Sequence, residues 1–498
     1  MTATSRRHTA DVGTISAIPL PFGVGLLLGG AATLWSVAAT ALTSSTGGDG
    51  DLSSTLLVAI ISITLGLGLI RLRPSVRKSP PVAMAMLVAG WVGIAVSGLM
   101  AMIISGAFDG AGDALFETVS ATTTTGFTTV ADPQTLPQSV RMLRVSLQWV
   151  SGLGVLVVGM GVLPVAVSGA ELTAARPLLR SKRIVTSAVG SFRNIIALYS
   201  LLTTVLMVGY FALGMSTFDA MSYALSTAST GGMANHAASI GHFESAPIEW
   251  LATAGMIAAG GNLMIVWWVM RGAIGSAWRS TELRLYASLL ALGSVVVWMG
   301  NGGLSIRDAA FSVSSMLSTT GFRAANWADG GSFVEAILLV GVGIGAMSGS
   351  VGSGVRLARV ARVALEVRRG LLHLLYPNRV EVVRMDGHAV DEDSLQYSYG
   401  FLWMHLITLG SMAALVNVAR FDVVGTLTFT LSAVSNVGVM IEGETITSYV
   451  AISGWSQLIA SIGMVLGRLS IYPVLITLAG LFRWFGRLRP GHEIGVGR

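Results

Sequence analysis

The chain has 498 residues, of which 53% are apolar and only 11% are charged. Soluble domains carry about 25% charged residues, so this composition excludes a water-soluble globule. Cysteine is absent, which excludes disulfides, thiolate metal sites and cysteine nucleophiles. The net charge of +6 arises from short basic clusters between apolar runs, and we therefore expect no nucleic acid partner.

Apolar runs long enough to cross a bilayer recur along the whole chain. A spanning helix needs about 20 apolar residues. About ten such runs are present, at 18–43, 54–72, 81–107, 138–166, 192–214, 247–270, 283–301, 332–365, 398–419 and 450–481. The first run is longer than the apolar core of a signal peptide, so we expect it to be retained. The pattern predicts an all-α integral membrane protein.

Arginine-rich loops alternate with these runs. They lie after every second span, at 71–78, 176–193, 271–284 and 356–384. The positive-inside rule places such loops in the cytoplasm, and an even number of spans places both termini there as well. The outer loops are acidic by comparison. This excess fits either an ordinary solvated surface or a mouth that concentrates cations.

Four outer segments, 113–126, 219–232, 308–321 and 425–438, are too short and too polar to span a bilayer. Aligned on their final glycines, all four have serine six positions earlier and a hydroxyl residue three positions earlier. These residues are Ser120, Ser226, Ser315 and Ser432, and then Thr123, Ser229, Ser318 and Ser435. Asp113, Asp219 and Asp308 open three of the segments, where we expect them to cap a helix.

Each segment is typical of a short re-entrant helix followed by an extended stretch, with one span on either side. Non-helical backbone at membrane depth must be buried in protein or reach water. Four such segments are therefore expected to converge on one axis in a pseudo-fourfold arrangement. Glycine allows carbonyls to turn inward, and rings of carbonyl oxygens suit alkali cations, most simply K⁺. We predict a central ion pore.

Further motifs resemble the Trk/Ktr/HKT superfamily of potassium transporters, and the TrkH type most closely. Residues 341–356 resemble the Gly/Ser-rich interruption in the second helix of the family's third repeat, and 375–388 its cytoplasmic segment before the fourth repeat. Gly467-Arg468-Leu469 is similar to the family's last-helix signature, although Ser470 follows where glutamate is usual. The first two apolar runs resemble the two extra helices that distinguish TrkH from KtrB.

The resemblance implies four tandem helix–pore-loop–helix repeats after two extra transmembrane helices. The expected units are the N-terminus with the extra helices at 1–80, repeat 1 at 81–183, repeat 2 at 184–282, repeat 3 at 283–370, a cytoplasmic connector at 371–397, and repeat 4 with the C-terminus at 398–498.

The resemblance also implies a selectivity filter, with K⁺ as the transported ion and no organic cofactor. The expected K⁺-binding residues are Thr124, Thr125, Gly126, Thr230, Gly231, Gly232, Thr319, Thr320, Gly321, Asn436, Val437 and Gly438. The glycine pair Gly231-Gly232 leaves the register of the second copy open by one residue. Arg323 lies near the outer mouth, where we expect it to weaken cation entry unless Asp329 or another carboxylate neutralises it.

A gate is expected below the filter, because a loop with nine Gly/Ser residues does not form a rigid helix; each glycine costs about 1 kcal/mol against alanine. The expected gate residues are Gly341, Gly343, Gly345, Ser348, Gly349, Ser350, Gly352, Ser353, Gly354 and Arg468. Arginine within a span costs at least about 2.5 kcal/mol. Arg468 is thus expected to hold the loop through backbone carbonyls or to form an electrostatic barrier; the alternative is a snorkelling or paired residue.

The function implied is channel-like potassium uptake across the bacterial cytoplasmic (inner) membrane. The resemblance further implies a homodimer in membrane lipid and a cytosolic nucleotide-binding ring of the TrkA kind. Alternatives are the potassium-binding subunit of a pumping ATPase, as in KdpA, and a poorly selective Na⁺/K⁺ transporter of the same superfamily. The seven histidines form no ligand pair at helical spacing, so we expect no enzyme.

Overall fold

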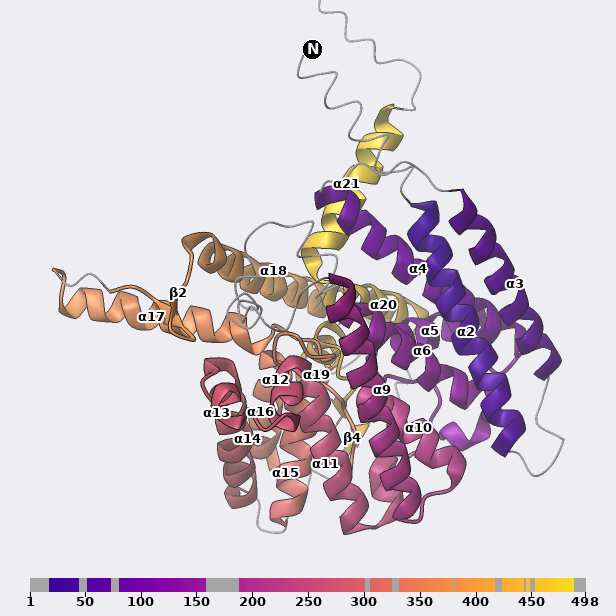
Figure 1. Ribbon diagram of the computed structural model, residues 1–498, viewed down its shortest axis with the longest axis horizontal. Helices are drawn as coiled ribbons and strands as arrows, with labels where there is room; N and C mark the ends of the chain where they lie inside the picture. Colours follow the sequence, from indigo (N-terminus) through magenta and orange to yellow (C-terminus); the bar gives the residue numbers. More distant parts are fainter. Residues whose placement is uncertain are drawn as a thin grey trace, which may run out of the picture.

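The computed structural model describes residues 18–43, 52–72, 80–157, 188–300, 305–324, 331–378, 381–416, 423–442, 445–447 and 453–487. This part of the chain is mostly helical (Figure 1). Its strands form two small antiparallel hairpins, β1 (Arg384–Met385) with β2 (His388–Ala389) and β3 (Met440–Glu442) with β4 (Thr445–Thr447). The predicted fold class is confirmed.

The helices repeat the same order four times. The first set is α4 (Pro80–Ile104), α5 (Ala111–Thr122) and α6 (Gln138–Val157). The second is α9 (Ala188–Ala212), α10 (Thr217–Ala228), α11 (Ala246–Gly260) and α12 (Leu263–Met270). The third is α14 (Thr281–Gly300), α15 (Ile306–Leu317), α16 (Gly331–Ile344) and α17 (Leu357–Leu375). The fourth is α18 (Glu392–Val416), α19 (Val423–Ser435), α20 (Gly454–Arg468) and α21 (Ile471–Arg487). Short turns are η1 (Pro133–Thr135), η3 (Ser239–Phe243) and α13 (Ile274–Ala277).

The repeats pack as a closed ring. The helix that follows each pore segment contacts the short pore helix of the next repeat: α6 packs on α10, α11 on α15, α16 on α19, and α20 returns to α5. The apolar and small residues of the short helices are buried by these contacts. Four short helices thus surround one axis, as the predicted pseudo-fourfold arrangement requires.

Two further helices, α2 (Pro19–Thr43) and α3 (Leu52–Arg71), pack on α4 at one side of the ring (Figure 1). Glycines allow the close approach. A Cβ on Gly25 would collide with the Gly90 carbonyl, and one on Gly66 would lie 2.6 Å from the Gly23 carbonyl. Small residues that bring backbones together are typical of helix pairs in membranes.

Several of the described helices are suited to a bilayer by length and composition. Six are long and apolar enough to span it: α2, α3, α4, α9, α14 and α18. Two bent pairs, α11 with α12 and α20 with α21, raise the number to eight. The remaining predicted spans correspond to α6, which carries Arg141 and Arg144, and to α16 with α17. The chain is a multi-pass membrane protein.

Two predicted spans, 247–270 and 450–481, are not continuous helices. The first bends by 115° and the second by 109°. At the first bend Gly261 is extended and the Asn262 side chain accepts a hydrogen bond from the Met264 amide, so a new helix begins there. At the second bend Ser470 has a φ of 64°, which ends a right-handed helix. Mean hydropathy does not register either change of backbone direction.

The predicted aspartate caps of the short helices are also wrong. The capping residues are Gly110, Ser216 and Ser305, each three positions before the aspartate. In α15 the Ser305 hydroxyl and the Asp308 carboxylate bond each other's backbone amides, which is a capping box. The aspartates therefore lie in the first turn, where negative charge favours the positive end of the helix dipole. In the fourth copy the nearest aspartate is Asp422, three residues before the segment. It lies outside the described residues, and α19 begins at Val423.

Candidate functional site

The four segments that follow the short helices share one backbone conformation. The final glycine and the residue two positions before it both have positive φ in every copy. The glycines are Gly126, Gly232, Gly321 and Gly438, and the preceding residues are Thr124, Thr230, Thr319 and Asn436. Positive φ is uncommon outside glycine. Its recurrence at a fixed position in four copies indicates a backbone that the packing imposes.

Hydrogen bonds within each copy repeat in the same way. The amide of the residue before the glycine donates to the carbonyl of the serine six positions before the glycine, over 2.9–3.0 Å. The donors are Thr125, Gly231, Thr320 and Val437, and the acceptors are Ser120, Ser226, Ser315 and Ser432. The shared serine position in the sequence thus marks the end of each short helix.

These angles decide the register of the second copy, which the sequence left open by one residue. Gly232 has a φ of 72° and Thr230 a φ of 49°, whereas Gly231 is not among the residues with positive φ. Gly232 is therefore the counterpart of the other three glycines. Gly231 occupies the position that threonine or valine occupies in the other copies.

The four glycines form a closed ring. A Cβ placed on Gly126 would lie 2.5 Å from the carbonyl oxygen of Gly231. In the same way, a Cβ on Gly232 would meet the carbonyl of Thr320, one on Gly321 that of Val437, and one on Gly438 that of Thr125. Each glycine therefore packs directly on the carbonyl that precedes the next glycine around the axis. No side chain fits at these four positions.

Polar side chains hold the four extended segments, here called the filter strands, through hydrogen bonds. The Ser120 and Ser315 hydroxyls donate to the carbonyls of Phe127 and Phe322, over 2.6 and 2.7 Å. Hydroxyl pairs join Thr123 to Thr125 and Ser318 to Thr320, each at 2.7 Å. In the fourth copy the Asn436 amide donates to the Met464 carbonyl over 2.9 Å and to Thr125. These bonds hold the backbone of the four segments in place.

The Gly/Ser-rich loop lies beside the third filter strand. The loop proper runs between α16 and α17, so Gly341 and Gly343 lie in the last turns of α16 and the other predicted loop residues lie in the break. The Ser353 amide donates to the Thr319 hydroxyl over 2.9 Å, and a Cβ on Gly352 would lie 2.8 Å from the Ser318 carbonyl. The loop therefore touches the strand that carries Gly321.

The same loop is held by two other repeats. From repeat 2, the Gly260 carbonyl accepts from the Met347 amide over 3.0 Å. From repeat 4, Arg468 Nη1 donates to the Val351 carbonyl over 2.8 Å and to the Ser353 hydroxyl over 2.9 Å. Arg468 is buried, and no acidic side chain pairs with it among the residues that the structure describes. Arg468 thus contacts one loop carbonyl, as expected, and one loop hydroxyl.

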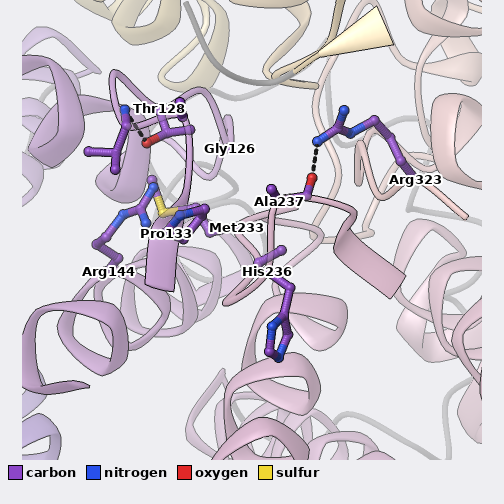
Figure 2. Close-up of a pocket in the computed structure, with 11 residues that line it drawn as sticks. Gly126, Thr128, Pro133, Arg144, Met233, His236, Ala237 and Arg323 are labelled. Atoms are coloured by element: carbon purple, nitrogen blue, oxygen red, sulfur yellow. Dashed lines mark hydrogen bonds between the residues drawn. The ribbon is translucent and has the colours of Figure 1, made fainter. Parts of the chain in front are cut away.

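A cavity of about 230 Å³ lies on the side of the filter that the sequence predicts to face outward, lined by Gly126, Thr128, Arg144, His236 and Arg323 among others (Figure 2). The Arg323 guanidinium donates to the Ala237 carbonyl over 2.6 Å. Burial lowers the pKa of Arg323. Its suggested partner Asp329 lies outside the described residues. A positive side chain therefore lines this cavity, and its effect on cation entry stays a prediction.

Behind this cavity is a buried ion pair that the sequence analysis missed. Arg144 Nε lies 3.0 Å from Glu117 Oε2, and both side chains are buried. Glu117 Oε1 also accepts from the Thr128 hydroxyl over 2.6 Å and from the Thr129 amide over 2.7 Å. The pair therefore fixes the strand that leaves the first filter. A carboxylate in the middle of α5, where α10, α15 and α19 have none, was the available signal.

A second missed cluster surrounds the start of α10. Asp219 accepts from Asn235 over 2.9 Å and from Ser216 over 2.7 Å, and it lies 3.3 Å from His236 Nε2. His236 also bonds the Gln134 side chain and stacks on His242. The cluster joins the loops that follow the first and second filters. No three of its His and Asp side chains are placed to hold one metal ion, and the described residues contain no such group elsewhere.

Comparison with known proteins places this architecture in one family. The family model described as "TrkH: Cation transport protein" matches residues 59–274 and 263–482. The chain is 28% identical to the Trk system potassium uptake protein TrkH of Halomonas elongata over 442 residues, or 85% of this chain and 91% of the relative. It is 30% identical to TrkH of Escherichia coli K12 over 389 residues, 74% of this chain and 79% of the relative.

The fold also matches a solved structure. The crystal structure of the potassium transporter TrkH from Vibrio parahaemolyticus superposes with a TM-score of 0.82 at 22% identity, covering 93% of this chain and 98% of that one. At this identity the likeness concerns the fold. Together with the family match over most of the chain, it leads to one conclusion: the chain belongs to the TrkH family of cation transport proteins.

Proposed function

We propose that this chain is the ion-translocating subunit of a Trk-type system and carries K⁺ into the cell through a gated, channel-like filter. The observation that carries the proposal is the closed ring in which four glycines each pack on the carbonyl of the next repeat. Carbonyl rings of this kind replace the hydration shell of an alkali cation. The relatives named above are potassium uptake proteins, which supports K⁺ as the ion.

Within this proposal the filter comprises three residues from each repeat, and their backbone carbonyls are the K⁺ ligands. The threonine, asparagine and valine members are buried, so their side chains support the backbone from behind. The carboxyl ends of the four short helices also direct partial negative charge toward the space beneath the filter. Both features favour a cation and disfavour an anion.

The Gly/Ser-rich loop is proposed as the gate, from Gly345 to Gly354. It contacts the third filter strand directly and is held by Arg468 from repeat 4. Replacing Arg468 with alanine would remove two hydrogen bonds that fix the loop. The loop would then move more easily, and cation flux through the chain alone should rise.

The membrane potential supplies the driving force for K⁺ entry, and the arginine-rich loops indicate the orientation of the chain in the membrane. A negative-inside potential is worth about 2.3 kcal/mol per charge per 100 mV, enough to draw K⁺ inward without ATP hydrolysis by this chain. We place it in the bacterial cytoplasmic membrane with both termini in the cytoplasm, on the basis of the arginine-rich loops. The proposal also includes the repeat boundaries predicted from the sequence and a homodimeric assembly. It further includes a cytosolic nucleotide-binding ring as regulator. On the predicted cytoplasmic side, α17 and the β1–β2 hairpin project from the helical body (Figure 1).

The proposal is tested by flux into liposomes that contain the purified chain under a negative-inside potential, with K⁺, Rb⁺, Na⁺ and Li⁺ compared. Preferential K⁺ and Rb⁺ flux, abolished in Gly321→Val and retained in Gly410→Ala, is the expected result. Gly410 lies on the exposed side of α18, where an added Cβ meets no atom within 4 Å. Equal Na⁺ flux would instead indicate a poorly selective transporter. Flux that requires ATP and a further subunit would replace the uptake channel with a pump subunit.

A further inference from the structure

One side chain from repeat 1 reaches into the filter of repeat 2. Gln148 lies in α6 and is fully buried. Its Nε2 donates to the carbonyl oxygen of Gly231 over 2.6 Å, and its Oε1 lies 3.3 Å from the Ser226 hydroxyl, which donates to it. Gly231 and Ser226 both belong to the second filter segment. The amide of Gln148 thus bridges the filter backbone and the end of the short helix.

The bridge occupies the space of a missing side chain. Residues equivalent to Gly231 in the other repeats are Thr125, Thr320 and Val437, and only repeat 2 has glycine there. A Cβ on Gly231 would collide with the Gln148 amide group. Gln148 therefore fills, from a neighbouring repeat, the volume that residue 231 leaves empty.

The bridge also replaces a hydroxyl pair that repeats 1 and 3 form within their own filter segments. Repeats 1 and 3 tie this position through the pairs Thr123–Thr125 and Ser318–Thr320, each at 2.7 Å. In repeat 2 residue 231 offers no hydroxyl, so Ser229 lacks this pair and donates to carbonyls of its own short helix, those of Leu225 and Ser226. Two consecutive glycines would leave this strand the most mobile of the four.

The consequence for the ring is an asymmetry at one ligand position. Among the described residues, no hydrogen bond reaches the carbonyls of Thr125, Thr320 or Val437, whereas the Gly231 carbonyl accepts one from Gln148. A carbonyl oxygen has two lone pairs, so it can accept this bond and still face a cation. The bond fixes the direction of the carbonyl and lowers its field strength, two quantities that govern discrimination between K⁺ and Na⁺.

We propose that Gln148 is a positioning residue for ion selectivity, which completes the second filter strand and aims the Gly231 carbonyl. The inference rests on the proposed function of the filter. It differs from a packing role because it predicts a change in the ratio of K⁺ to Na⁺ flux. It also predicts that a hydroxyl introduced at residue 231 can replace the hydrogen bond that Gln148 supplies.

The first test is Gln148→Leu, which keeps the bulk of the side chain and removes the donor. We expect the ratio of K⁺ to Na⁺ flux in liposomes to fall about three- to tenfold, the range for loss of one buried hydrogen bond. Gln138→Leu, the same change on the same helix away from the filter, should leave the ratio unaltered. Gly231→Ala displaces the Gln148 amide without altering α6 and should lower the ratio similarly, which covers the case of an unfolded Gln148→Leu.

The second test is a rescue. Gln148→Ala combined with Gly231→Thr frees the space and restores a Ser-x-Thr pattern with Ser229, as in Ser318–Thr320 of repeat 3. Gly231 lies outside the positive-φ region, so it accepts a side chain without strain. We expect the double variant to regain most of the K⁺ preference that Gln148→Ala loses.

The outcomes separate the two claims. A wild-type chain that conducts no K⁺ would refute the proposed function. A selective wild-type chain with unchanged selectivity in folded Gln148→Leu and Gly231→Ala would overturn the role of Gln148 alone. The role of Gln148 would also be overturned if Gln148→Ala and Gly231→Thr lowered the K⁺ to Na⁺ flux ratio additively in the double variant. Additive effects would mean that the two residues act on selectivity independently.

Discussion

The ion pair between Glu117 and Arg144 leads to a quantitative prediction. Removing one partner of a buried pair leaves an uncompensated charge, which costs about 3–5 kcal/mol of folding free energy. Both side chains are buried here, so solvent screening offers little relief. We therefore expect Glu117→Gln and Arg144→Met each to lower the free energy of unfolding by about this amount.

The geometry determines how the two changes combine. The atoms lie 3.0 Å apart but are not aligned as a directed hydrogen bond, so the attraction is mainly Coulombic. Once both charges are gone, neither remains unpaired, and the double variant should cost clearly less than the sum of the single variants. We expect a coupling of about 1–3 kcal/mol.

The assay is a double-mutant cycle from reversible unfolding of the purified protein in detergent. A matched control is the pair Arg369–Glu392, which is about as close, at 3.2 Å, but has two partly exposed side chains. Glu392→Gln should cost less than about 1 kcal/mol. Additive losses in the Glu117/Arg144 cycle, or an equal loss at Glu392, would refute the reasoning. Because Glu117 holds Thr128 and Thr129, Glu117→Gln should also reduce K⁺ flux in liposomes.

Three further predictions follow from single contacts. Trp91 Nε1 donates to the Thr122 carbonyl at the end of α5 over 2.9 Å, so Trp91→Phe should cost about 0.5–1.5 kcal/mol in the same unfolding assay; no change would mean that the bond is not formed. Arg323→Gln removes a positive charge from the outer cavity and should raise the rate of cation entry, with a smaller gain at high salt; an equal gain at all salt concentrations would exclude an electrostatic cause. Burial alone would raise the pKa of Asp219, but hydrogen bonds lower it below its ordinary 3.8; the donors are His236, Asn235 and Ser216. The ionised carboxylate therefore stabilises the fold above about pH 4, and this stabilisation is lost below it. The difference in unfolding temperature between wild type and Asp219→Asn should shrink in acid. A constant difference from pH 7 to pH 3 would contradict this prediction.

The repeat pattern was readable from the sequence because the filter needs particular residues. The four filter positions require glycine, because φ is positive there and an added Cβ would collide with the next carbonyl. The serine six positions earlier bonds the carbonyl that follows the filter glycine in repeats 1 and 3. These demands leave glycine and serine at fixed spacing in all four copies. Spacing alone could not decide between Gly231 and Gly232, because only the backbone angles distinguish them.

Other features depend on contacts between distant residues. Glu117 and Arg144 lie on different helices, and Gln148 acts on another repeat altogether. The bends after α11 and α20 were hidden because both arms are apolar, so hydropathy reads each as one span. The Arg468 contact with the loop was anticipated only in general form; its acceptors, the Val351 carbonyl and the Ser353 hydroxyl, required the fold.

The central claim is that K⁺ is bound by carbonyls that the four repeats contribute to one ring. Its most direct test is the position of Rb⁺, located by its anomalous scattering in crystals of the protein grown in a rubidium salt. The account predicts density on the axis, within coordination distance of the Thr125, Gly231, Thr320 and Val437 carbonyls, and loss of that density when Na⁺ replaces Rb⁺. Ordered Rb⁺ away from this ring, with the ring itself empty, would contradict it.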